Sequence, residues 1–240
     1  MRVRCFRLVV LLGFGLLAGI APHFASAQID ELPRPDSADA GSFGVSVALG
    51  DSHAVVGASG EARCGPNAGA VYVYERVPGP KFDEWRGVAR LTPRTCRAGA
   101  FFGEQVALSG QRLLVSASSG ELFAEAGSNA AYLFTRTPTG SWEQTARFTG
   151  PENRSDGSFA AGIDLDGDRA VVSTSGSPDG KINGAVYVYD YDAATQEWQQ
   201  SARLTVPPDE SAGILGRGVA LHDNRVAVAA STYFEDTPGG

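Results

Sequence analysis

The segment at residues 164–168, Asp-Leu-Asp-Gly-Asp, has the residue types and spacing that most suggest a metal site. Asp164, Asp166 and Asp168 would supply clustered carboxylate oxygens, and calcium takes several oxygen ligands in proteins. Three matching segments of the same length lack these ligands: residues 49–53, 108–112 and 221–225. We therefore expect a short hairpin here, with Asp166 and Gly167 as its turn pair. Calcium is the weaker alternative, and no other cofactor is expected.

Cys64 and Cys96 are the two cysteines that remain when the N-terminal leader described below is removed. Cys64 follows the second expected strand of a repeat, and Cys96 lies in the connection to the next repeat. In an up-and-down sheet these connections emerge on the same side, so a disulfide is feasible if the Cα atoms come within roughly 7 Å. Two unpaired loop thiols are the alternative.

Residue types used in acid-base or nucleophilic catalysis form no recognisable constellation. His23 belongs to the leader, whereas His53 and His222 occupy equivalent hairpins and are expected to be exposed turn residues. No G-x-S-x-G nucleophile elbow accompanies a matching histidine. We therefore expect no catalytic residues and a protein that is not an enzyme.

Tryptophan and arginine recur in one register, with each arginine five residues after its tryptophan. The tryptophans could be mistaken for a sugar-stacking platform and the arginines for an anion site. Their strict place in the pattern instead favours packing and a repeated structural contact. The residues are Trp85, Trp142, Trp198, Arg90, Arg147 and Arg203.

The elements that must position these residues also repeat. A leucine ends the first expected strand of each copy at Leu49, Leu108, Leu165 and Leu221, which are 59, 57 and 56 residues apart. Each full copy predicts four short strands, with small residues in the first two and aromatic residues in the outer two. This period and strand number are typical of a β-propeller blade. A stacked β-solenoid is the structural alternative, although it would normally show a shorter period.

We therefore expect an all-β fold: a β-propeller of four-stranded antiparallel blades, with about three and a half blades forming an open arc. The N-terminal segment 28–42 matches the end of each later repeat, so residues 28–34 are expected to be the closing outer strand of a final blade. The chain is expected to be truncated, which would leave apolar inter-blade surface exposed. The repeats are predicted at about residues 43–101, 102–158, 159–214 and, incompletely, 215–240.

The first repeat carries a motif that supports a family name. Residues 43–49 read F-G-V-S-V-A-L, followed by V-V-G-A-S at 55–59 and G-A-V-Y-V-Y at 69–74. This pattern resembles the FG-GAP repeat of integrin α-subunit propellers, and most closely the bacterial secreted proteins built from such repeats. The resemblance weakens in later copies, which have Phe159-Ala160 and Leu215-Gly216 in place of Phe-Gly.

The resemblance implies a propeller, usually of seven blades, used in extracellular or cell-surface recognition. Family propellers also bind calcium after the first strand of some blades, through a longer D-x-D-x-D-G-x-x-D segment. Residues 164–168 are shorter than that pattern, which adds to the case for a turn.

The N-terminus predicts export. Arg2, Arg4 and Arg7 precede an apolar stretch at residues 8–20 and a small-residue Ala-Ser-Ala site, so residues 1–27 are expected to be a signal peptide cleaved after Ala27. Cleavage would leave no membrane span. It would also change the formal charge from −7 to −10, because three arginines and no acids are removed. Such an acidic chain is a poor partner for nucleic acid.

The leading functional hypothesis is a non-enzymatic recognition, adhesion or structural module, located in the periplasm, on the cell surface or outside the cell. Its partner would be an extracellular protein or a cell-surface ligand, including a glycan. A carbohydrate-binding propeller is the alternative, and an enzyme with its site in missing blades is less favoured. Any functional loop is expected among the parts that do not repeat, at residues 63–67, 121–129 and 178–183.

Overall fold

The computed structural model describes residues 32–33, 41–79, 83–117, 129–150, 159–175, 184–205 and 214–231. Regular structure in these residues is entirely β-strand, arranged as three four-stranded antiparallel sheets and a final hairpin. This confirms the predicted all-β fold of four-stranded blades. The expected signal peptide at 1–27 lies outside the described residues.

Strands that follow one another in the chain are also neighbours within each sheet. Blade one contains β1 (Phe43–Leu49), β2 (His53–Ala58), β3 (Ala70–Val77) and β4 (Glu84–Leu91). Blade two contains β5 (Val106–Ser109), β6 (Arg112–Ala117), β7 (Ala130–Arg136) and β8 (Trp142–Thr149). Blade three contains β9 (Phe159–Asp166), β10 (Arg169–Thr174), β11 (Ala185–Asp192) and β12 (Glu197–Leu204). The hairpin of blade four contains β13 (Ile214–His222) and β14 (Arg225–Ser231).

The second and third strands of each blade form its buried centre because both of their faces are covered. In β3, Val71 and Val73 face the core shared with blade two, whereas Tyr72 and Tyr74 face a separate core on the opposite side of blade one. Successive side chains of a strand point to opposite faces of the sheet, so this segregation follows directly from alternation. Large β-branched and aromatic residues suit such a two-sided position.

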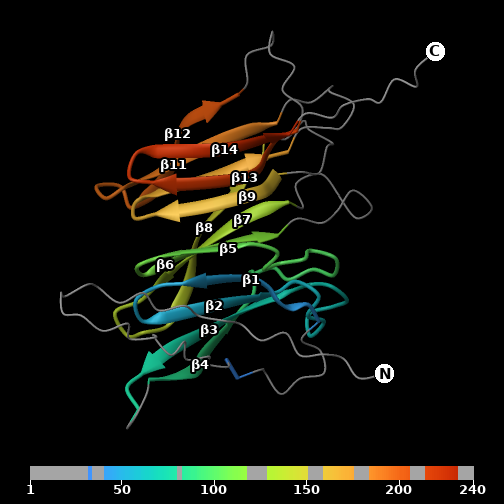
Figure 1. Cartoon of the computed structure of the whole chain (residues 1–240), viewed down its shortest axis with the longest axis vertical. Helices are drawn as coiled ribbons and strands as arrows, with labels where there is room; N and C mark the ends of the chain where they lie inside the picture. Colours follow the sequence, from blue (N-terminus) through green and yellow to red (C-terminus); the bar gives the residue numbers. More distant parts are fainter. Residues whose placement is uncertain are drawn as a thin grey trace, which may run out of the picture.

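The blades stack face to face in chain order along the long axis of the molecule (Figure 1). Separate cores fill the spaces between blades one and two, between blades two and three, and between blade three and the final hairpin. The first strands β1, β5, β9 and β13 contact one another in succession. Neighbouring blades therefore meet most closely along their first strands.

Glycine permits this close approach. Gly103 has φ +91°, and a Cβ atom placed on it would lie 2.7 Å from the carbonyl oxygen of Ala70 in blade one. The same residue is tied across the blade boundary, because the Ser46 hydroxyl donates to the Gly103 carbonyl oxygen over 2.7 Å. The glycine of the Phe-Gly pair is thus required by the contact between blades.

Blade one and the blade-four hairpin lie at opposite ends of the stack (Figure 1), so the described blades form an open series. Val45, Val47 and Leu49 of β1 are exposed on the unpaired side of blade one, at 46%, 46% and 51%. Part of that side is covered by Leu32, which is buried in a core with Tyr72 and Tyr74. Residues 28–31 and 34–40 of the expected closing segment lie outside the described residues.

The described part of the chain contains no helix that is long and apolar enough to cross a membrane.

Candidate functional site

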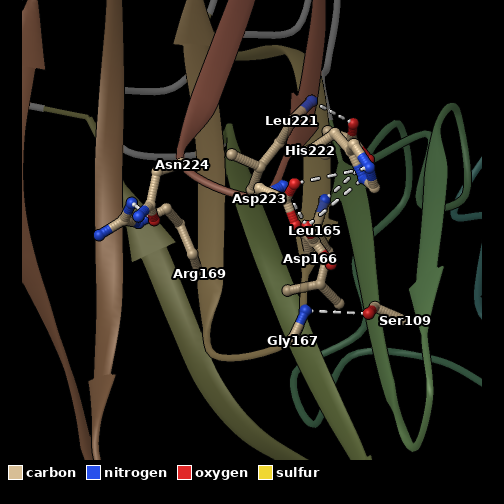
Figure 2. A network of polar contacts seen from close by, with 10 residues as sticks. Ser109, Leu165, Asp166, Gly167, Arg169, Leu221, His222, Asp223 and Asn224 are labelled. Atoms are coloured by element: carbon tan, nitrogen blue, oxygen red, sulfur yellow. Dashed lines mark hydrogen bonds and ion pairs between the residues drawn. The ribbon is translucent and has the colours of Figure 1, made fainter.

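The three aspartates of residues 164–168 are used in contacts between blades. Figure 2 shows Asp166 beside His222 and Asp223 of blade four. Asp164 accepts hydrogen bonds from the backbone N–H of Leu165 at 2.8 Å and from that of Leu221 in blade four at 2.6 Å. Asp166 accepts one from the N–H of Asp223, also in blade four, at 2.7 Å. Asp168 turns the other way and pairs with Arg112 of blade two. These carboxylates therefore point to two different neighbouring blades.

The hairpin turn lies one residue later than expected. Asp166 pairs with Arg169, which leaves Gly167 and Asp168 as the two connecting residues. Gly167 has φ +55°, and it stands at the same point as Gly110 in blade two, with φ +56°, and Asp223 in blade four, with φ +50°. The left-handed residue comes first in each turn, so the glycine occupies that position and Asp166 stays in the strand.

Asp166, His222 and Asp223 each place one potential metal-ligand atom within 4.8 Å of the others. His222 is 89% exposed, and its Nδ1 lies 3.8 Å from Asp166 whereas its Nε2 lies 3.9 Å from Asp223. The imidazole thus presents a different nitrogen to each carboxylate. Because the His222 side chain is so exposed, few contacts fix its position. Asp166, in addition, already accepts a backbone hydrogen bond.

The second candidate region is the disulfide between Cys64 and Cys96, whose Cα atoms are 6.1 Å apart. It joins the β2–β3 loop to the β4–β5 connection, and both leave the sheet from the same end (Figure 1). Backbone bonds reinforce the junction: Gly99 donates to Pro66 at 2.8 Å, Phe101 to Asn67 at 2.9 Å and Phe102 to Ala68 at 3.1 Å. These two segments therefore form one ordered unit.

Sequence reasoning missed the charged centre of this unit. Glu61 is fully buried, and Arg90 Nη2 donates to its Oε2 at 2.7 Å. Arg63 approaches the other oxygen at 3.5 Å. Burying a charged group is costly unless it is paired and hydrogen-bonded. No local pattern indicates the role of Glu61, because its partner Arg90 comes 29 residues later in the chain, on β4.

The repeated arginines have a structural role in the later blades. Arg147 and Arg203 each lie over a tyrosine on the neighbouring strand of their own blade, at 5.7 Å from the Tyr132 ring and 5.8 Å from the Tyr187 ring. Arg90 faces Tyr72 in the same register but binds Glu61 instead. In blade one, the arginine at this repeated position therefore binds a residue of the β2–β3 loop instead of packing on a tyrosine.

The expectation of an exposed turn is wrong for His53. His53 is only 6% exposed at the start of β2, and its ring centroid lies 5.9 Å from that of Trp142 in blade two. The next blade covers the hairpin end, which a reading of one repeat by itself does not reveal. Burial and the nearby Arg136 lower the pKa of His53, while Glu75 opposes them. His222, in contrast, is exposed as expected.

The tryptophans pack between strands and blades. Trp142 is buried, and Trp198 contacts Phe148 of blade two at a ring-centroid distance of 5.9 Å. Trp85 is a partly buried neighbour of the core on the outer side of blade one. All three therefore take part in packing, as their repeated position predicts.

The Ser52 hydroxyl and His53 Nδ1 are 2.8 Å apart, which raises the question of a nucleophile and its base. The opposite ring nitrogen, Nε2, is buried without a hydrogen-bond partner. A carboxylate that orients the imidazole is therefore lacking at this pair. Of the other non-repeating loops, residues 121–128 and 178–183 lie outside the described residues.

A protein-family model described as FG-GAP repeat matches the chain at residues 27–74, 85–134 and 142–189, more than half of its length. The second match spans β4 to β7 and the third spans β8 to β11. The sequence unit thus begins at the outer strand of one blade and ends in the third strand of the next. A search of curated proteins found no match to the chain.

Proposed function

The chain belongs to the FG-GAP repeat family, and from that premise we propose that it is a non-enzymatic recognition module that acts outside the cytoplasm. In this proposal the stacked blades are a scaffold, and connections at one end of the sheets engage an extracellular protein or a cell-surface ligand. FG-GAP repeats build propeller-type modules that often serve in extracellular binding, which supports the assignment.

The observation that carries the proposal is the disulfide-tied pair of connections in blade one. The aspartate contacts of blade three, and the recurring tryptophan and arginine contacts, are accounted for by packing within and between blades. The Cys64–Cys96 unit adds a covalent tie and two long connections, residues 59–69 and 92–105, at an end of the sheet where short turns would suffice for the fold. Ordered loops on a rigid scaffold are common places for binding residues.

Two further observations support action outside the cytoplasm. The first 27 residues have the charge, apolar core and small-residue end of a signal peptide. Disulfides persist in oxidising compartments and are rare in the cytosol. The Cys64–Cys96 bond therefore agrees with the export that the leader predicts.

The proposal is tested by binding the exported, processed protein to an array of immobilised extracellular proteins and polysaccharides. We expect saturable binding that weakens when Cys64 and Cys96 are both replaced by serine. Equal binding of the two proteins to every feature, or no binding at all by the parent protein, would overturn the assignment of recognition to this unit.

A further inference from the structure

We propose that residues 61–67 and 92–99, here called the arginine corner, bind a polysaccharide that carries carboxylate or sulfate groups. This inference rests on the proposed function and specifies the ligand class of the same site. Three exposed arginines define the corner: Arg63, Arg94 and Arg97. Arg63 precedes Cys64 and Arg97 follows Cys96, so the disulfide holds their backbones near each other.

The positive charge of the corner is particular to blade one. Its two connections, residues 59–69 and 92–105, hold three arginines and two glutamates, Glu61 and Glu104. The corresponding connections around blade two, 118–129 and 150–158, hold one arginine and four acidic residues. Those around blade three, 175–184 and 205–213, hold one lysine and three acidic residues. The repeat therefore imposes no positive charge at this place.

The single acid of the corner does not cancel this charge at the surface. Glu61 is fully buried and is bound by Arg90, an arginine of β4 that lies beneath the loop. The ion pair between Glu61 and Arg63 is longer, at 3.5 Å, and the Arg63 side chain remains 45% exposed. Arg90 is thus the closer partner of Glu61, and the Arg63 side chain stays exposed to solvent.

The corner is also held in place before any ligand arrives. Arg94 is anchored to blade two, because its backbone N–H donates to Gln144 Oε1 at 3.0 Å and its Nη2 donates to the Gln144 carbonyl oxygen at 2.9 Å. Gly65 has φ +122° and lies against Ala98 across the disulfide, which keeps the two segments in contact. Such preorganisation reduces the ordering cost of binding.

The ligand class follows from the side chains present. The planar guanidinium group can donate two parallel hydrogen bonds at once to two oxygens of a carboxylate or of a tetrahedral sulfate group. The exposed large hydrophobic residues of the described chain lie on β1, β4 and β12 and not in the corner. Protein interfaces usually require buried aromatic or aliphatic anchors. A hydroxyl-rich anionic chain therefore fits better than an acidic protein.

The test measures affinities of the processed protein for polygalacturonate and dextran sulfate, with neutral dextran as the uncharged control and poly-L-glutamate as the polypeptide alternative. We expect binding to at least one anionic polysaccharide, weakened by salt. Replacing Arg63 and Arg97 together by serine should lower that affinity about tenfold or more. The matched control, Arg86→Ser, removes an exposed arginine from the other end of β4 and should leave the affinity unchanged.

The melting temperature of each variant establishes that it is folded, and the single variants Arg63→Ser and Arg97→Ser replace the double variant if that one unfolds. Unchanged affinity in folded variants, no polysaccharide binding by the parent, or tighter binding to poly-L-glutamate would each overturn the inference. If the protein binds a ligand on the array but none of the anionic polysaccharides, this inference is wrong and the proposed function still holds. Absence of both would reject both.

Discussion

At the scale of single residues, Asp164 shows how a motif that resembles a metal site can serve packing. Its two carboxylate oxygens accept hydrogen bonds from Leu165 within the strand and from Leu221 in the next blade. A carboxylate used in this way satisfies a backbone donor of the neighbouring blade at the point where the two first strands meet. Charge-assisted bonds of this kind are stronger than neutral ones.

We predict that Asp164→Ala lowers the free energy of unfolding by about 1 to 3 kcal/mol, because the buried Leu221 loses its acceptor. Urea unfolding of the mutant and parent measures this difference. Asp51→Ala, in the exposed hairpin of blade one, is the control and should cost less than about 0.5 kcal/mol. Adding calcium should leave the melting temperature of the parent unchanged; a rise of several degrees would favour the calcium alternative.

His53 makes the free energy of unfolding depend on pH. Its pKa is lowered from the ordinary value of 6.5 by burial and by Arg136, so the unfolded chain binds a proton more readily than the folded chain does. Stability should therefore be greatest above pH 6.5 and decline as the pH falls through the lowered pKa. Unfolding free energies measured between pH 7.5 and pH 5 should show this decline.

His53→Gln is the matching variant, since glutamine keeps a polar side chain that does not titrate in this range. It should flatten the dependence on pH. An identical decline in parent and variant would show that other groups cause it. Asp190, whose pKa is lowered chiefly by its hydrogen bond to Arg169, loses its contribution only at more acidic pH.

At the scale of elements, the strands and their pairing follow from the sequence. The contacts that bury residues at the strand ends and in the loops do not. Alternation and the repeated leucine positions predict four short strands in each full repeat, because each strand pairs with its neighbour in the chain. The burial of His53 depends on Trp142, which is almost ninety residues away and belongs to another blade. The ion pair of the buried Glu61 likewise depends on Arg90, which is 29 residues away on β4. Single repeats carry no signal of either contact.

Gly103 tests the close approach of first strands. We predict that Gly103→Ala costs about 2 to 3 kcal/mol, because a Cβ atom would meet the Ala70 carbonyl oxygen as well as occupy a left-handed conformation. Gly110→Ala is the matched control: its φ is +56° but nothing lies within 4 Å of the added atom, so only the backbone term of about 1 kcal/mol applies. Equal losses in the two variants would show that the blades do not meet as described.

At the scale of the whole molecule, the repeats separate structure from recognition. Contacts that recur from blade to blade hold the stack together, and the non-recurring disulfide unit lies at one end of the first sheet. The sequence match spans neighbouring blades, from the outer strand of one to the third strand of the next. The order of strands and the open series of blades were predictable, whereas the ligand was not, because loops diverge while the scaffold repeats.

The central claim is that binding resides in the arginine corner of blade one and that the repeating contacts serve only the fold. The most direct measurement determines both affinity for the bound array ligand and melting temperature in two variants. Replacing Arg63 and Arg97 by serine should lower the affinity of the folded protein about tenfold. Trp198→Ala, which removes a repeated packing contact with Phe148, should lower the melting temperature while the affinity of the folded protein holds. Loss of affinity in the folded tryptophan variant, with none in the arginine variant, would contradict the account.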